Sequence, residues 1–490
     1  MEFSQLYYVF LFLPLFFLCY YFFGRFFGLR GKNITLLLFS LLFYAWGEPI
    51  YVLLMFYSTA LDYTCGLGIG RAAARGSTRG KKAWLAVSLV GNLGLLAVFK
   101  YLDLFLSTLN ILPFVNLPLA HIALPIGISF YTFQTMSYSI DVYLGKVKPQ
   151  RDIANFATYV TMFPQLVAGP VVRYQTVEAD LSCRTETIDD FAMGLRRFIV
   201  GLAKKVLIAN TMGAVADSLY NPALDSAVAA EISYLGVLGS WVVVMAYTMQ
   251  IYFDFSGYSD MAIGIGRMMG FRFLENFNYP YISKSITEFW RRWHISMSTF
   301  FRDYVYIPLG GNRCSRARWI FNILVVWFLT GLWHGAQWNF VLWGLYFAVI
   351  LLLEKLFLGK LLDRLPVLNR IYALFLIMYG WVIFRCNTIG EILEFTKTLF
   401  GAYGWRGNGS LPSVSLLSMA EVGTIQIAVF LIAIVAATPI LSGLKAFATR
   451  TPGRERVMHM AADVALFVLF GLSVVELTLG SYNPFIYFKF

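Results

Sequence analysis

The sequence predicts an all-helical, polytopic integral membrane protein, and three observations lead to this fold class. Hydrophobic residues make up 59% of the 490-residue chain and charged residues only 13%. A soluble domain carries about 25% charged residues, so most of this protein's surface is expected to face lipid. The apolar residues also gather in runs long enough to cross a bilayer as helices. The basic residues gather between these runs.

Thirteen apolar runs are candidate membrane spans. Two of them are short, and one or two are expected to re-enter rather than cross. Since a span needs about 20 mostly apolar residues, we expect about 11 or 12 transmembrane helices. The runs cover residues 6–23, 34–47, 48–69, 83–107, 121–144, 196–215, 232–252, 254–270, 319–333, 338–357, 371–389, 423–443 and 459–480.

The basic residues behind the net charge of +12 lie mainly in the loops between the apolar runs, so this charge does not indicate nucleic-acid binding. Lys and Arg cluster after the first, third and fifth runs and in later groups, whereas residues 108–120, 217–230 and 401–422 are nearly free of them. Cytoplasmic loops carry the excess of basic residues in membrane proteins. We therefore expect the N-terminus outside the cell membrane and the basic loops in the cytoplasm. The side of the C-terminus stays open.

The stretch 275–318 is too polar to face lipid and too hydrophobic for a free loop. It contains a helix-like segment from Ser283 to about Phe301. Polar backbone at membrane depth is tolerated only inside protein or around a water-filled cavity. We expect this stretch to re-enter the protein from the cytoplasmic side. No linker separates soluble domains, so a single transmembrane domain over residues 1–490 is expected.

His334 is the outstanding candidate among the four histidines, because an ionisable side chain inside an apolar segment is costly. It stands in the sequence Gly331-Leu332-Trp333-His334-Gly335, with Asn339 nearby. The glycines allow a close approach to the backbone, and Trp333 would shield the imidazole from water. A desolvated, near-neutral histidine suits the general base of an acyl transfer. The alternative is a structural histidine bonded to a neighbouring helix.

His294 is the second candidate. On a continuous helix, Trp290, His294 and Met297 would share one face. This placement suggests that His294 orients or polarises an acyl carbonyl, and simple packing is the alternative. His121 and His459 lie at the edges of apolar runs and are expected to be structural.

Several charged residues lie in or near the same stretch. Arg291, Arg292 and Arg302 would form a positive funnel for the phosphates of an acyl carrier. The positive-inside rule explains the same charges without a ligand. Asp254 is an intramembrane acid, expected to pair with one of these arginines or to orient a histidine. The five scattered cysteines show no metal-binding spacing, so no metal site is expected.

Several segments of the chain carry recognisable motifs, and their core lies at about 247–346. The segments are 163–174 (FPQLVAGPVVRY), 252–260 (YFDFSGYSD), 277–281 (FNYPY), 289–296 (FWRRWHIS), 301–311 (FRDYVYIPLGG), 331–335 (GLWHG) and 482–488 (YNPFIYF). Through these motifs the chain resembles, over nearly its whole length, the membrane-bound O-acyltransferase (MBOAT) family, in its bacterial branch of alginate O-acetylation (AlgI type) proteins.

The resemblance implies a ring of tilted helices around a thin central funnel and tunnel. His334 would be the catalytic histidine and His294 the second signature histidine. Acetyl-CoA would enter from the cytoplasm of a bacterium, and no metal would take part. Acetyl would pass through the inner membrane to an extracytoplasmic SGNH-type acetyltransferase, which decorates a polysaccharide such as alginate.

Several alternatives stay open at this point. A D-alanyl or lipid O-acyltransferase of the same family is the nearest. A transporter of polysaccharide or lipid-linked sugar is the other, although paired broken spans are not found. The sequence leaves open the acceptor polymer, the acyl group, the oligomeric state, and the choice between a covalent acetyl-histidine and a general base.

Overall fold

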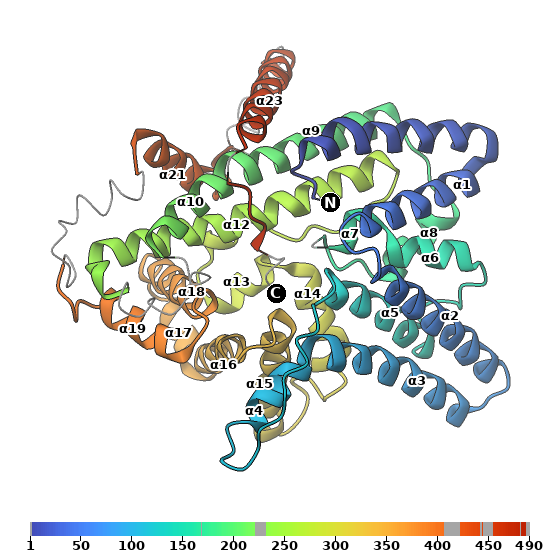
Figure 1. Ribbon diagram of the computed structural model, residues 1–490, viewed down its shortest axis with the longest axis horizontal. Coiled ribbons are helices and arrows are strands. Elements are labelled where there is room, and N and C mark those ends of the chain that lie inside the picture. Colours follow the sequence, from blue (N-terminus) through green and yellow to red (C-terminus); the bar gives the residue numbers. More distant parts are fainter. Residues whose placement is uncertain are drawn as a thin grey trace. The chain divides into compact units, whose positions relative to one another are not determined.

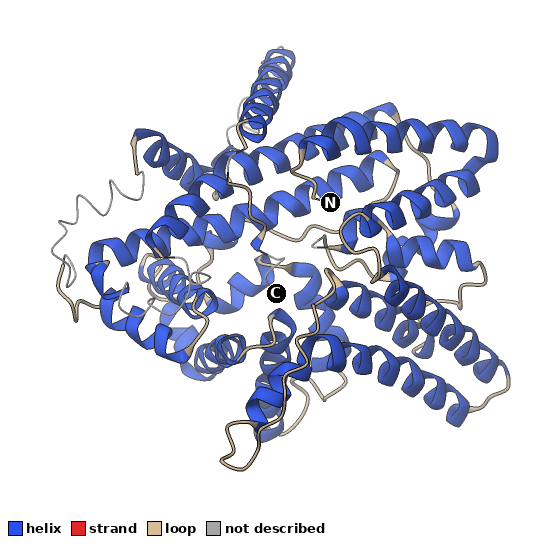
Figure 2. Cartoon of the chain, in the orientation of Figure 1, coloured by secondary structure: helices blue, strands red, loops and turns tan. Residues whose placement is uncertain are grey.

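The structure is a computed structural model that describes residues 2–167, 169–220, 232–405, 422–441, 443, 454–480 and 482–486. Within these residues every regular element is a helix (Figure 2). Eight helical stretches are long and apolar enough to cross a membrane. The all-helical, multi-span class predicted from composition is therefore confirmed.

The eight stretches are fewer than the 11 or 12 helices expected. The runs 232–252 and 254–270 form one continuous helix, α12 (Gly236–Met268). Two further runs form helices shorter than 18 residues, namely α5 (Ile128–Tyr143) and α21 (Thr424–Ala436). The helix α15 (Arg316–His334) is long enough but is not among the eight, because its hydropathy is too low.

The described chain forms two compact units, each made of two segments. Unit 1 comprises Met1–Phe198 and Tyr258–Glu275, and unit 2 comprises Ile199–Gly257 and Asn276–Phe490. The chain passes from one unit to the other within α9 (Ile188–Ala203) and within α12. The expectation of a single domain stays a prediction.

Unit 1 begins with a helical hairpin formed by η1 (Tyr8–Phe12) and α1 (Leu13–Ala45) (Figure 1). Gly28 interrupts α1 with φ 60° and ψ −147°, a conformation that suits only glycine. Because the chain reverses there, the ring centroids of Phe12 and Phe39 lie 5.6 Å apart. The runs 6–23 and 34–47 are the two arms of this hairpin.

A bundle of α2 (Val52–Ala74), α3 (Thr78–Leu96) and α5 follows in unit 1 (Figure 1). It encloses the carboxylate of Asp62, which accepts hydrogen bonds from Ser88 and Ser139 at 2.5 Å and from Asn92 at 2.7 Å. These donors offset the cost of a charge at membrane depth. The other helices confined to unit 1 are η2 (Ala97–Tyr101), α4 (Leu102–Leu109), α6 (Ile153–Thr161), α7 (Phe163–Leu166) and α8 (Tyr174–Ser182).

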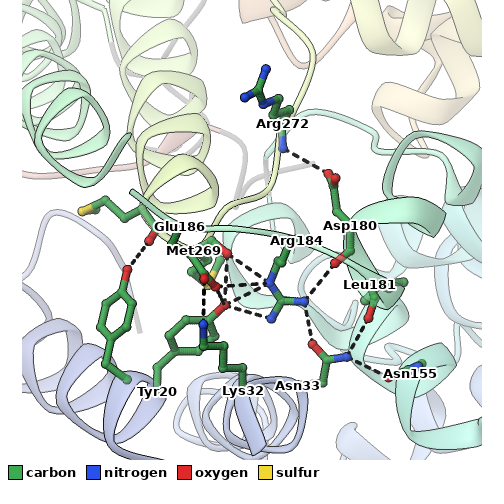
Figure 3. A network of polar contacts seen from close by, with 12 residues as sticks. Tyr20, Lys32, Asn33, Asn155, Asp180, Leu181, Arg184, Glu186, Met269 and Arg272 are labelled. Carbon is green, nitrogen blue, oxygen red and sulfur yellow. Dashed lines mark hydrogen bonds and ion pairs between the residues drawn. The ribbon is translucent and has the colours of Figure 1, made fainter. Parts of the chain in front are cut away.

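A buried network around Arg184 connects α1, the end of α8 and the end of α12 in unit 1 (Figure 3). The guanidinium donates to the Tyr20 hydroxyl at 2.8 Å and to Asn33 Oδ1 at 2.7 Å. Glu186 completes the network through an ion pair with Lys32 at 2.6 Å. Since a buried charge must be compensated, these contacts tie together segments that are distant in sequence.

Unit 2 is organised around the antiparallel pair α15 and α16 (Trp338–Leu353). A Cβ atom at Gly344 would lie 2.2 Å from the Trp327 carbonyl oxygen, so the two backbones meet directly. The other helices of unit 2 are η3 (Lys204–Ala209), α10 (Asn210–Leu219), η4 (Pro280–Ile282), α13 (Ile286–Arg292), α14 (Ile295–Phe301), η5 (Arg302–Tyr306), η6 (Glu354–Leu358), α17 (Gly359–Leu362), α18 (Leu368–Arg385), α19 (Ile389–Leu399), α21 and α23 (Arg454–Thr478).

The segment around His294 differs from the sequence-based prediction. The continuous helix expected from Ser283 to about Phe301 is broken into α13 and α14. His294 lies at the break with φ 45° and ψ 53°, a left-handed conformation that is uncommon outside glycine. Trp290 and His294 therefore do not share a helical face, and that prediction was wrong.

Candidate functional site

His334 is the last residue of α15 and is 3% exposed. Its imidazole is surrounded by aromatic rings, with centroids 5.0 Å away for Trp333, 4.9 Å for Trp343 and 5.5 Å for Phe384. These rings come from α15, α16 and α18. An ionisable ring thus lies in an apolar enclosure that excludes bulk water, which is the setting expected for a desolvated base.

The glycines on either side of His334 serve the packing of α15 against α16. A Cβ atom at Gly331 would lie 2.3 Å from the Phe340 carbonyl oxygen, and one at Gly335 would lie 2.2 Å from the Phe340 ring. The close approach to the backbone that these glycines were expected to allow is thus made by Phe340 of α16. This packing fixes the end of α15 and with it the position of His334.

His294 lies near His334, with Trp333 between them. The Trp333 ring centroid is 5.8 Å from His294 and 5.0 Å from His334. Phe255 of α12 packs edge-on against His294, with centroids 4.7 Å apart and an interplanar angle of 89°. The structure thus brings together the two histidines and Trp333 that the sequence singled out. His294 comes from the break before α14, and Trp333 and His334 come from the end of α15.

The imidazole of His294 is fully buried in a connection outside the eight candidate spans. Burial lowers the pKa of His294 to about 3, because desolvation disfavours the charged ring. His294 is therefore neutral at physiological pH. Its Nδ1 atom lies 3.2 Å from Oδ1 of Asn276, a residue that sequence reasoning did not select. Nothing in the sequence distinguishes Asn276 from the neighbouring Asn278.

A cavity that is partly open to solvent lies in unit 2, and neither histidine is among the residues that line it. Its wall includes Trp290, Trp327 and Thr330. Thr330 is one helical turn before His334 and lies on the same face of α15. Trp290 packs against Trp343 with centroids 5.5 Å apart, and Trp343 contacts His334. Trp290 thus lines the cavity on one side and packs on the other against Trp343, a ring of the histidine enclosure.

Two basic side chains, Arg302 and Lys355, line the cavity. Arg302 also pairs with Asp303 at 2.6 Å. In the sequence Lys355 was only one member of a basic group near the end of a run, so it was missed. It reaches the cavity because η6 continues α16 alongside α15.

The other two arginines expected to bind the acyl donor are not among the residues that line this cavity. Arg291 is exposed, and Arg292 pairs with Glu288 at 2.9 Å. Of the three predicted arginines, only Arg302 thus reaches the cavity.

The remaining predicted site residues have structural partners. Asp254 forms a buried ion pair with Lys205 at 2.7 Å and accepts a hydrogen bond from the Ile486 backbone N–H at 2.9 Å. The expected pairing with an arginine or a histidine was wrong, because η3 brings Lys205 against α12. Asn339 donates to the Cys386 carbonyl oxygen at 2.7 Å and so joins α16 to the end of α18.

Of the two other histidines, only the side chain of His121 is described, and it is not part of this group. His121 is exposed in unit 1. The side chain of His459 lies outside the described residues.

Comparison with known proteins assigns the chain to a family. Residues 95–387, more than half of the chain, match the sequence model of MBOAT, the membrane-bound O-acyltransferase family. The chain belongs to the membrane-bound O-acyltransferase family. It is therefore an O-acyltransferase rather than a transporter, and the MBOAT resemblance found in its motifs is confirmed.

Three MBOAT relatives illustrate the range of named activities. The chain is 39% identical to a protein of Azotobacter vinelandii named "Probable alginate O-acetylase AlgI", over 100% of both chains. It is 32% identical to a peptidoglycan O-acetyltransferase of Helicobacter pylori, over 81% of this chain and 79% of that one. It is also 30% identical to a teichoic acid D-alanyltransferase of Bacillus subtilis, over 52% of this chain and 65% of that one.

Proposed function

We propose that this protein transfers acetyl groups from cytoplasmic acetyl-CoA across the bacterial inner membrane for the O-acetylation of an extracytoplasmic polysaccharide, with alginate as the first candidate. The burial of His334 in an enclosure of aromatic rings carries the proposal. The full-length similarity to alginate O-acetylases supports the choice of acyl group and acceptor class. The similarity to the peptidoglycan O-acetyltransferase keeps other bacterial polysaccharides as alternatives.

The cavity would receive the donor. Arg302 and Lys355, which both line the cavity, would bind phosphates of acetyl-CoA. The aromatic wall formed by Trp290 and Trp327 would pack against the apolar part of the donor. The thioester would then reach His334 past Trp343.

His334 would act on the acyl transfer itself. In one route its imidazole removes the proton of the attacking hydroxyl, the new ester C–O bond forms, and the C–S bond of the thioester breaks. The proton then passes to the departing thiolate and gives the free thiol of coenzyme A. In the other route the unprotonated imidazole nitrogen attacks the thioester, an N–C bond forms as the C–S bond breaks, and the departing thiolate takes the ring proton to give the free thiol of coenzyme A. The hydroxyl then attacks the acetyl group, the ester C–O bond forms as the N–C bond breaks, and the hydroxyl proton returns to the imidazole.

The membrane arrangement would separate donor from acceptor. The basic loops predict a cytoplasmic entrance and an N-terminus outside the inner membrane. An SGNH-type acetyltransferase outside the membrane would receive the acetyl group and modify the polysaccharide. Acetyl-CoA is a substrate in this scheme, and no metal is required.

The test uses the purified full-length protein with acetyl-CoA radiolabelled in the acetyl group. Wild type is compared with His334→Ala and with His121→Ala, whose exposed side chain lies outside the candidate site. Label transferred or released by wild type and His121→Ala, but not by His334→Ala, would support the proposal. Turnover that survives in folded His334→Ala would overturn the role of His334.

D-alanyl transfer is the second candidate, favoured by the similarity to the teichoic acid D-alanyltransferase. That similarity covers 52% of this chain, whereas the similarity to the alginate O-acetylase covers all of it. A D-alanyl thioester that is used faster than acetyl-CoA would reverse this ranking.

A further inference from the structure

The hydrogen bonds of Asn276 identify which nitrogen of His294 carries a proton. Asn276 Oδ1 accepts from the Ser296 backbone N–H at 3.2 Å and from the Ser296 hydroxyl at 2.9 Å. A backbone N–H is always a donor, so the atom facing it is the oxygen and not the nitrogen of the amide. The same Oδ1 lies 3.2 Å from His294 Nδ1. An oxygen that only accepts requires the proton to be on Nδ1.

The second ring nitrogen, Nε2, is then without a proton. It is buried and has no hydrogen-bond partner among the residues that the structure describes. Buried polar atoms are almost always hydrogen-bonded, and the exceptions call for an explanation. A substrate group that enters the enclosure between Phe255 and Trp333 would supply the missing partner.

The backbone around His294 is held by the same asparagine. The Asn276 carbonyl oxygen accepts from the Ile295 N–H at 3.0 Å, while its side chain binds the Ser296 N–H. Asn276 thus satisfies two backbone N–H groups in the first turn of α14, where the His294 side chain forms no cap. These bonds support the left-handed conformation of His294 and fix the direction of its ring.

We propose that Asn276 is a positioning residue that holds His294 in the Nδ1-protonated tautomer, so that Nε2 accepts a hydrogen bond from the hydroxyl or thiol of a reacting substrate. This inference rests on the proposed function for the identity of the substrate. It differs from the carbonyl-polarising role expected for His294, because polarising a carbonyl oxygen requires a proton on Nε2. The burial that keeps the ring neutral is consistent with an acceptor role.

The tautomer is measured directly by nitrogen NMR of the full-length protein, labelled with ¹⁵N in the histidine rings and held in lipid nanodiscs. The signals of His294 are assigned by their loss in His294→Gln. Wild type is expected to show a protonated Nδ1 and an unprotonated Nε2, which resonate far apart. A proton on Nε2 in wild type would overturn the proposal.

Three variants test whether Asn276 sets the tautomer of His294 or only caps the first turn of α14. Asn276→Ala removes the acceptor and is expected to give mixed tautomers, with kcat lowered at least about tenfold, since a positioned acid–base group contributes roughly 10²- to 10⁴-fold. Asn276→Asp keeps an acceptor oxygen and should retain the Nδ1–H tautomer, which covers the case in which the alanine variant does not fold. Ser296→Ala removes one bond to the same Oδ1 and should leave the tautomer as in wild type.

These experiments distinguish a failure of this proposal from a failure of the proposed function. The NMR result needs no turnover, so it stands even if acetyl-CoA proves to be the wrong donor. A folded Asn276→Ala variant that keeps the wild-type tautomer would overturn the positioning role. In turnover assays the loss should fall on kcat and leave the KM for acetyl-CoA within about twofold, since Arg302 and Lys355 are untouched.

Discussion

The buried ion pair between Lys205 and Asp254 allows a test of how residues 482–486 are held against the rest of unit 2. The side chains are 3% and 1% exposed, and their charged atoms lie 2.7 Å apart. Lys205 also donates to Asn210 Oδ1 at 2.9 Å and to the Pro484 carbonyl oxygen. The second carboxylate oxygen of Asp254 binds the Ile486 N–H. Each charge thus has its partner inside the protein.

Removal of one partner should leave the other charge buried without an opposite charge beside it. We expect Asp254→Asn, and separately Lys205→Met, to lower the free energy of unfolding by about 3–5 kcal/mol. The double variant should be much less destabilised than the sum of the two, because an apolar or neutral pair no longer buries a charge.

The assay is unfolding in mixed micelles with increasing sodium dodecyl sulfate, followed by tryptophan fluorescence. Lys397→Met is the matched control, since the lysine of the Lys397–Glu394 pair is exposed and its loss should change the stability far less. Single variants as stable as the control, or additive effects in the double variant, would refute the buried-pair argument.

Three further predictions follow from packing, charge and protonation. Gly344→Ala should destabilise the α15–α16 pair by about 1–3 kcal/mol in the same assay and lower turnover, while Gly94→Ala, which has open space for its Cβ, should be tolerated. Lys355→Ala should raise the KM for acetyl-CoA about tenfold, the loss of one charge-assisted hydrogen bond, and an unchanged KM would remove Lys355 from the donor site. Because burial lowers the pKa of His294 from 6.5 to about 3, the folded state binds fewer protons than the unfolded chain in this range. Stability should therefore fall as pH drops from 6.5 toward 3, and His294→Gln should weaken that decline.

Much of the fold class and both candidate histidines could be predicted from local sequence. Long apolar runs determine that helices cross a membrane, because lipid requires every backbone group to be bonded within the segment. His334 and His294 are recognisable because an ionisable group in an apolar, aromatic setting is costly and therefore informative. Both predictions depend on residues that are near one another in the chain.

Only the tertiary structure decided how the polar groups are paired. Asp254 binds Lys205 because η3 packs against α12, and Lys355 joins Arg302 at the cavity because η6 extends α16. The break at His294 depends on Asn276, which holds the first turn of α14. Local composition is enough to predict that an apolar side chain is removed from water, since any lipid or protein neighbour can cover it. A hydrogen bond or ion pair needs one partner at one distance and angle, and the packing of helices that are distant in sequence supplies that partner.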